Sequence, residues 1–134
     1  MDLIKLLILG MLVMHGIGHI TGFLTSWTKI HMGFTDNPWI FSKNVHLNSP
    51  IGKVVGLAWL AALICFLVAA FGLFTGQPYW MNFAVIAAIC SLLVILPWPR
   101  TVVPGALYGG TLANLFILVM AFGPWKEFFL ALAK

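Results

Sequence analysis

The sequence predicts an all-α integral membrane protein, a polytopic bundle of four transmembrane helices. Hydrophobic residues make up 62% of the 134 residues and charged residues only 7%. A soluble domain of this size has too much surface for so few charges, so lipid is the solvent that fits. Crossing a bilayer takes about 20 helical residues. We expect the spans at residues 3–24, 54–75, 80–96 and 105–122, in a single domain covering residues 1–134.

Proline and tryptophan mark the ends of these segments. Prolines adjoin an end of each of the last three (Pro50, Pro97 and Pro124), where the missing N–H and the ring disturb a helix least. Four tryptophans lie at predicted helix ends, as in the aromatic belts of membrane interfaces: Trp27, Trp80, Trp98 and Trp125. The first segment is too long for a signal peptide and lacks a small-residue cleavage site, which predicts a retained helix.

Two histidines, His15 and His19, lie one helical turn apart inside the first segment. At about 100° per residue they share a helix face with Gly18 and Gly22. Titratable side chains in hydrocarbon are costly and usually face a bundle interior, a partner or a cavity. Glycines let a neighbouring helix approach closely. We therefore expect both imidazoles to face inward.

The other hydrogen-bonding side chains of the spans fall in the same half of the bilayer as His19. Together with Arg100 of the third loop, they predict a polar half-cavity that opens toward the first and third loops. The candidate ligand-binding residues are His15, His19, Trp59, Ser91, Thr111, Asn114 and Arg100.

The histidine pair admits several interpretations. Histidines at i and i+4 can hold a metal ion, and imidazole suits zinc, copper, iron and nickel. No carboxylate lies in any span, and the other spans contain no histidine. A metal or haem at His15 and His19 would therefore need His31 or His46 from the first loop. The pair could equally be structural, could face a ligand or could handle protons, and the sequence leaves these alternatives open.

The first loop, residues 25–53, is long and contains an apolar cluster of Trp39, Ile40 and Phe41. Burying each large side chain gains about 1.5–3 kcal/mol, so we expect the cluster to pack over the open half of the bundle or to lie in the membrane interface. Either position would bring His31 or His46 near the mouth of the cavity, with the loop as a lid.

The charged residues favour one orientation of the chain in the membrane and argue against nucleic acid as a partner. The net charge of +4 is scattered, unlike the clustered basic face that binds nucleic acid, and it suits contact with anionic lipid. Three basic residues lie on the face of the termini and four on the loop face: Lys5, Lys126 and Lys134 against Lys29, Lys43, Lys53 and Arg100. Because Lys5 begins the first helix, we expect cytoplasmic termini in a prokaryotic inner or plasma membrane.

Scattered short motifs extend over nearly the whole chain. They are His15-Gly16-x-x-His19-x-x-Gly22, Gly56-Leu57-x-Trp59-Leu60-Ala61, Ser91 and Gly110-Thr111-x-Ala113-Asn114. In these motifs the chain resembles an uncharacterised group of small prokaryotic four-helix membrane proteins. The group's pattern has an Asp and a Lys shortly before the last helix, where this chain has Pro99-Arg100-Thr101. The resemblance implies a four-helix membrane bundle and no known activity.

The sequence thus favours a membrane protein that binds a small or hydrophobic ligand, such as a lipid, a quinone, or a metal or haem, beside the histidine pair. The alternative is a structural or accessory subunit, whose glycine stripes pack against a second copy or a larger membrane complex. Enzymatic activity is not indicated, because the spans hold no acid and no Cys–His pair is evident.

Overall fold

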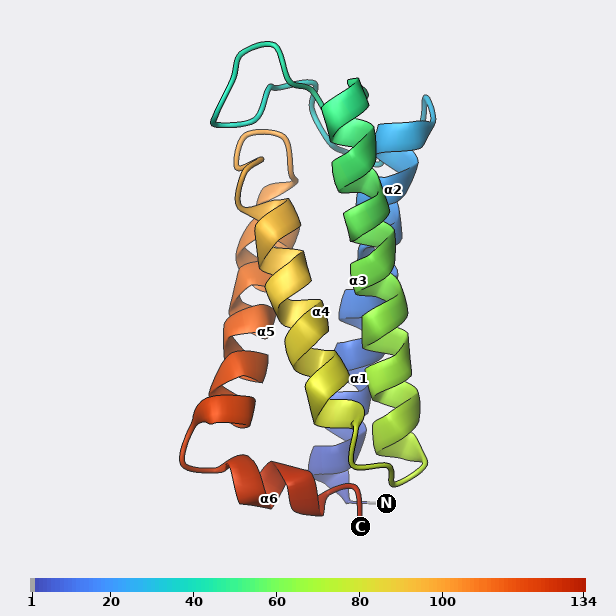
Figure 1. The fold of residues 1–134 in the computed structure, drawn as a ribbon, viewed down its shortest axis with the longest axis vertical. Coiled ribbons are helices and arrows are strands. Elements are labelled where there is room, and N and C mark those ends of the chain that lie inside the picture. The colour runs from blue at the N-terminus through green and yellow to red at the C-terminus, as the bar shows by residue number, and fades with distance from the viewer. Residues whose placement is uncertain (1) are drawn as a thin grey trace.

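Across residues 2–134 the chain folds into six helices. The structure, a computed structural model, describes residues 2–134 and contains no strand there. The helices are α1 (Leu3–Gly18), α2 (Ile20–Trp27), α3 (Pro50–Phe74), α4 (Trp80–Ile95), α5 (Pro104–Phe122) and α6 (Lys126–Ala131). The four long helices run along the long axis and α2 continues α1, while α6 lies across the end that holds both termini (Figure 1).

Local sequence signals explain where the helices begin. Ser49 caps α3, since its side-chain oxygen accepts from the backbone N–H of Gly52 at 3.2 Å. Proline follows at the first helical position of α3 and of α5, where its missing N–H is not needed. Asp2 caps α1 in the same way through the N–H of Ile4. The helices α3, α4 and α5 begin or end within four residues of the predicted segments.

In the part of the chain that the structure describes, three helical segments are long and apolar enough to cross a membrane: Leu3–Trp27, Pro50–Phe74 and Pro104–Phe122. Helix α4 is apolar but has only 16 residues. Large apolar side chains project outward from all four long helices, among them Leu7, Phe71, Leu93 and Leu112. The outer surface of the bundle is therefore as apolar as a lipid-facing surface requires.

The first predicted segment is interrupted at His19, between α1 and α2. The backbone N–H of His19 donates to the carbonyl of Gly16 at 2.9 Å, one residue short of the regular α-helical partner. The next turn is also loose, because Phe23 N and His19 O are 3.5 Å apart. The segment continues to Trp27, three residues beyond the predicted end.

The core has two parts along the bundle. One part lies among α1, α3, α4 and α5 and centres on Leu12, Phe66, Trp80 and Ile117. The other lies toward the loops and contains Phe34, Leu47, Trp59, Ile95, Trp98 and Val102. Helix α3 packs along α1, α2 and α4, whereas α1 and α5 touch only over a short stretch. The α1–α5 seam is thus the weakest-packed side of the bundle.

The first loop packs against the third loop. The backbone N–H of Thr35 donates to Thr101 O at 3.0 Å, and that of Ile40 to Pro97 O at 2.9 Å. Trp39 packs on Trp98 with ring centroids 5.8 Å apart. Ile40 and Phe41 are 59% and 70% exposed. Trp39 therefore packs against the protein, as one of the two expected positions of the cluster requires. Ile40 and Phe41 do not pack in this way.

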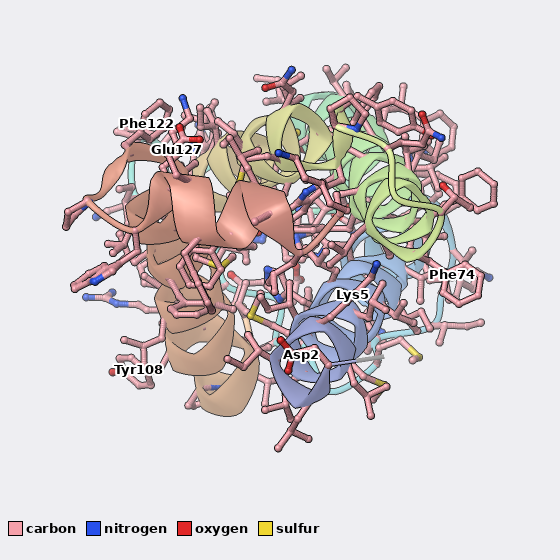
Figure 2. The ribbon with its side chains drawn as sticks, turned by 90° about the horizontal axis from the view of Figure 1, so that it is seen from below. Asp2, Lys5, Phe74, Tyr108, Phe122 and Glu127 are labelled. Carbon is pink, nitrogen blue, oxygen red and sulfur yellow. The ribbon has the colours of Figure 1, made fainter. Side chains whose placement is uncertain are left out.

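Helix α6 was not predicted, because Gly123 and Pro124 indicated the end of the helical region. It crosses the end of the bundle near the start of α1, where Asp2 and Lys5 lie, with Glu127 at its rim (Figure 2). Phe129 of α6 packs edge-to-face on Phe116 of α5, with ring centroids 6.3 Å apart. This helix closes one end of the α1–α5 seam.

Candidate functional site

A closed ring of four hydrogen bonds joins α1, α4 and α5. Nε2 of His15 bonds Oδ1 of Asn114 at 2.9 Å, and Nδ2 of Asn114 donates to Oγ of Ser91 at 2.7 Å. Nε2 of His19 bonds the same Ser91 Oγ at 2.7 Å, and Nδ1 of His19 bonds the backbone oxygen of His15 at 2.8 Å. His19, Ser91 and Asn114 are buried. Four of the seven predicted site residues therefore meet.

The partners fix the direction of each hydrogen bond for neutral imidazoles. A backbone carbonyl only accepts, so Nδ1 of His19 carries the proton and Nε2 of His19 accepts from the Ser91 hydroxyl. Ser91 Oγ in turn accepts from the Asn114 amide. The Asn114 oxygen only accepts, so Nε2 of His15 carries the proton. Each of the four bonds thus has one donor and one acceptor, and Nδ1 of His15 is left with a free lone pair.

This Nδ1 atom faces α5 across a small gap. No hydrogen bond within residues 2–134 uses it, and it is not among the fully buried unpaired atoms. A Cβ added to Gly110 would lie 3.2 Å from His15 Cε1 and 4.0 Å from Nδ1. The missing side chain of Gly110 therefore leaves the Nδ1–Cε1 edge of the imidazole open to a neighbouring cavity.

The cavity has a volume of about 150 Å³. A cavity of about 150 Å³ can hold a benzene-sized ring; it is too small to enclose a haem. Its lining comes from the break between α1 and α2, from the first turns of α5 and from single residues of α3, α4 and the third loop. The lining residues are Met14, His15, Gly18, His19, Thr21, Trp59, Ile95, Val102, Ala106 and Gly110.

Aromatic side chains hold the two imidazoles in position. Phe66 of α3 lies against both, with ring centroids 4.7 Å from His15 and 5.3 Å from His19. Trp59 lies 5.5 Å from His19 and packs flat on Gly22, where an added Cβ would be 2.1 Å from the indole. Gly22 therefore allows the close approach between α2 and α3 that the sequence predicted, whereas Gly18 has open space beside it.

The other predicted site residues lie apart from the ring. The hydroxyl of Thr111 donates to Leu107 O within α5 at 2.6 Å, and Thr111 does not line the cavity. Arg100 lines a separate hollow beside Trp39 and Lys43. Trp59 lines the cavity, and its buried Nε1–H has no partner within residues 2–134.

The loop histidines do not approach the pair. Nδ1 of His46 lies 3.0 Å from Oδ1 of Asp36, and His31 lines a pocket at the end of α2. Neither borders the His15 cavity, so the expectation that the loop brings one to its mouth is wrong. Within residues 2–134, no three metal-binding side chains come close enough to hold an ion. Both ring nitrogens of His19 are also engaged, so the residues present do not fit a metal shared by the pair.

Some site residues were missed by sequence reasoning. Phe66 supports both imidazoles but looks like an ordinary core residue in an apolar run. Gly110 belongs to one of the short motifs, and its position one turn before Asn114 is the signal that it faces His15. Met14, Thr21, Ala106 and Val102 complete the cavity wall without any sequence signal.

Comparisons with protein-family models, with curated proteins and with solved structures found no significant match to this chain.

Proposed function

We propose that this protein is a four-span membrane protein that binds an amphipathic ligand through a hydroxyl group, such as a quinol or a lipid alcohol, in the cavity beside His15. The observation that carries the proposal is the free lone pair of His15 Nδ1 at the edge of a ring-sized cavity. A neutral imidazole nitrogen without a proton accepts a hydrogen bond, so a hydroxyl donor is the complementary group.

The apolar exterior supports four membrane spans. Helix α4 is roughly 24 Å long at 1.5 Å per residue, close to the hydrocarbon thickness of about 30 Å. The partly exposed Tyr79 precedes it, as expected of an interfacial anchor, whereas Trp98 beyond its other end is buried in the core. Both termini lie at the same end (Figure 1), as an even number of spans requires. We retain the orientation with cytoplasmic termini and the prokaryotic membrane as part of the proposal.

A second hollow on the same side of the bundle supports an amphipathic ligand. It has a volume of about 320 Å³ and is lined by apolar residues of α1, α5 and α6: Ile4, Leu7, Ile8, Met11, Phe116, Phe128 and Phe129. The wall residues of α1 extend from His15 to Ile4, roughly 16 Å along the helix. A ligand with its head at His15 would therefore lay its chain along the α1–α5 seam toward α6, and would enter from the lipid.

The test compares a decyl-substituted benzoquinol with its dimethyl ether, which lacks the hydroxyl protons. With purified protein in a neutral detergent, we expect the quinol to bind three- to tenfold more tightly, since one hydrogen bond contributes about 1 kcal/mol. In His15→Phe the two probes should bind equally. The phenyl ring fills the space of the imidazole but offers no lone pair to a hydroxyl group. Equal binding of both probes to the unaltered protein would refute the hydroxyl proposal.

The alternative is a structural or accessory subunit of a membrane complex. The closed hydrogen-bond ring favours it, because such bonds link helices by about 0.6–2 kcal/mol each. If neither probe binds, and if His15→Phe and Ser91→Ala both aggregate while the unaltered protein purifies with a partner or as an oligomer, this alternative holds. A visible absorption band or stoichiometric metal in the purified protein would instead favour a metal or haem ligand.

A further inference from the structure

A further pocket lies at the loop end of the molecule, apart from the hydrogen-bond ring of His15, His19, Ser91 and Asn114. Its volume is about 650 Å³. The end of α2, the turn that follows it, parts of the first loop and the first turn of α3 form its wall. The lining residues are Thr25, Ser26, Trp27, Thr28, Lys29, His31, Thr35, Asp36, Leu47, Asn48 and Lys53.

Specific contacts build this wall. The indole N–H of Trp27 donates to the carbonyl of Lys53 at 3.0 Å, which ties the end of α2 to the start of α3. The ammonium of Lys53 lies 5.8 Å from the centroid of the same indole, within reach of a cation–π attraction. The hydroxyl of Thr25 lies 2.8 Å from the carbonyl oxygen of Thr21 and 3.2 Å from that of His31, so its one proton is shared between α2 and the turn. The pocket is therefore a shaped hollow with a fixed frame.

The turn that follows His31 reverses the direction of the chain. Met32 and Gly33 have positive φ angles of 47° and 82°. This left-handed reversal sends Phe34 into the core, where it packs on Trp59 at 5.8 Å between ring centroids. His31 is left at the pocket wall on the outer side of the turn.

The charged groups of the pocket favour an anion. Two lysines, Lys29 and Lys53, and one acidic residue, Asp36, line the pocket. The Asp36 carboxylate already lies 3.0 Å from Nδ1 of His46, outside the lining. The lysines, the amide of Asn48 and the imidazole of His31 offer several N–H donors around one hollow. Phosphate oxygens accept such bonds, and basic hollows at membrane surfaces bind phosphorylated head groups.

We propose that this pocket binds a phosphate group through Lys29 and Lys53. The phosphate comes either from a phospholipid head group or from a soluble phosphate. The pocket shares no lining residue with the His15 cavity, so the two sites are separable by mutation.

The experiment measures binding to the full chain in a neutral detergent micelle, by thermal shift and by native mass spectrometry. Three probes are used: phosphatidic acid, diacylglycerol with the same acyl chains, and inorganic phosphate. Phosphatidic acid should bind at least tenfold more tightly than diacylglycerol, because only the first carries phosphate. Lys29→Gln together with Lys53→Gln should remove this preference. His15→Phe should leave it unchanged, which separates this site from the hydroxyl site.

The matched control is the double variant Lys43→Gln with Arg100→Gln. It makes the same change in net charge at the same end of the molecule but alters a different hollow. Retention of the phosphate preference in this control supports the pocket. If both double variants lose the preference for phosphatidic acid equally, general charge attraction explains the binding and the proposal is overturned. The proposal is also overturned if the unaltered protein binds phosphatidic acid and diacylglycerol equally. Binding of inorganic phosphate identifies a soluble phosphate as the source, and binding of the phospholipid alone identifies the head group.

Discussion

The imidazole of His19 donates from Nδ1 to the backbone carbonyl of His15, 2.8 Å away. In a regular helix the backbone N–H of His19 would use that carbonyl, but here it donates to Gly16 instead. The side chain therefore replaces a backbone hydrogen bond at the break between α1 and α2. Because the carbonyl of His15, one turn earlier, holds the imidazole of His19, the Nε2 atom of His19 has a defined position for the hydroxyl of Ser91.

Ser91→Ala should destabilise the protein by about 1–3 kcal/mol, because it leaves Nε2 of His19 and Nδ2 of Asn114 buried without partners. The measurement is denaturant or thermal unfolding in detergent. Thr111→Val is the control, since its hydroxyl bonds only a carbonyl of its own helix, and it should change the stability much less. Equal losses in the two variants would argue against a special role for the ring.

Gly22→Ala should destabilise the protein by about 1–3 kcal/mol through overpacking, because its Cβ would enter the indole of Trp59. Gly18→Ala, on the same helix face, meets nothing within 4 Å and should be neutral or stabilising by up to about 1 kcal/mol. Thermal unfolding of the pair is the measurement. A larger loss for Gly18→Ala than for Gly22→Ala would contradict the packing described.

Gly18→Leu should abolish quinol binding, because the new side chain projects from the wall of the His15 cavity. Gly10→Leu is its matched control: Gly10 also has open space around it but does not line the cavity. Both variants should unfold at or above the midpoint of the unaltered protein, since leucine favours a helix more than glycine does. Binding that survives in Gly18→Leu would locate the ligand elsewhere.

Single cysteines at Asp2 and Gln77 should react with a membrane-impermeant maleimide from one side of the membrane, and a cysteine at Lys43 from the other. The reason is the up-and-down order of the long helices, which puts the α3–α4 turn at the end of the termini (Figure 1). The native Cys65 and Cys90 are first replaced by alanine. Labelling of positions 2 and 43 from the same side would mean that the α1–α2 segment does not cross.

The helical periodicity of the sequence was enough to expect His15 and His19 on an inward face, and both lie in the interior network. It could not predict which helix meets them, because the register of α4 and α5 depends on packing between segments far apart in the chain. Their depth in the bilayer put Ser91 and Asn114 among the candidates, but this packing decides that they, and not Thr111, bond the pair. The same limit explains the error over His31 and His46: the turn at Met32 and Gly33 directs the loop toward α3 and the third loop.

The break at His19 also escaped prediction. A run of apolar residues with glycines predicts one continuous helix. The imidazole of His19 competes with its own backbone N–H for the carbonyl of His15, and this depends on the side-chain rotamer, which the sequence does not give. Helix α6 is short, and tertiary contacts such as that between Phe129 and Phe116 support it. Elements of this size are rarely stable alone, so the local sequence carries little signal for them.

The amide of Asn114 limits what the hydrogen-bond ring can conduct. A relay of protons requires each member to take up a proton at one atom and release one from another. Histidine and serine can do this, but the amide nitrogen of Asn114 would have to lose a proton while its oxygen gained one. A proton that reaches His15 Nδ1 from the cavity therefore has no continuous route through the ring to Ser91. The edge of His15 that faces Gly110 is therefore where the path of such a proton ends.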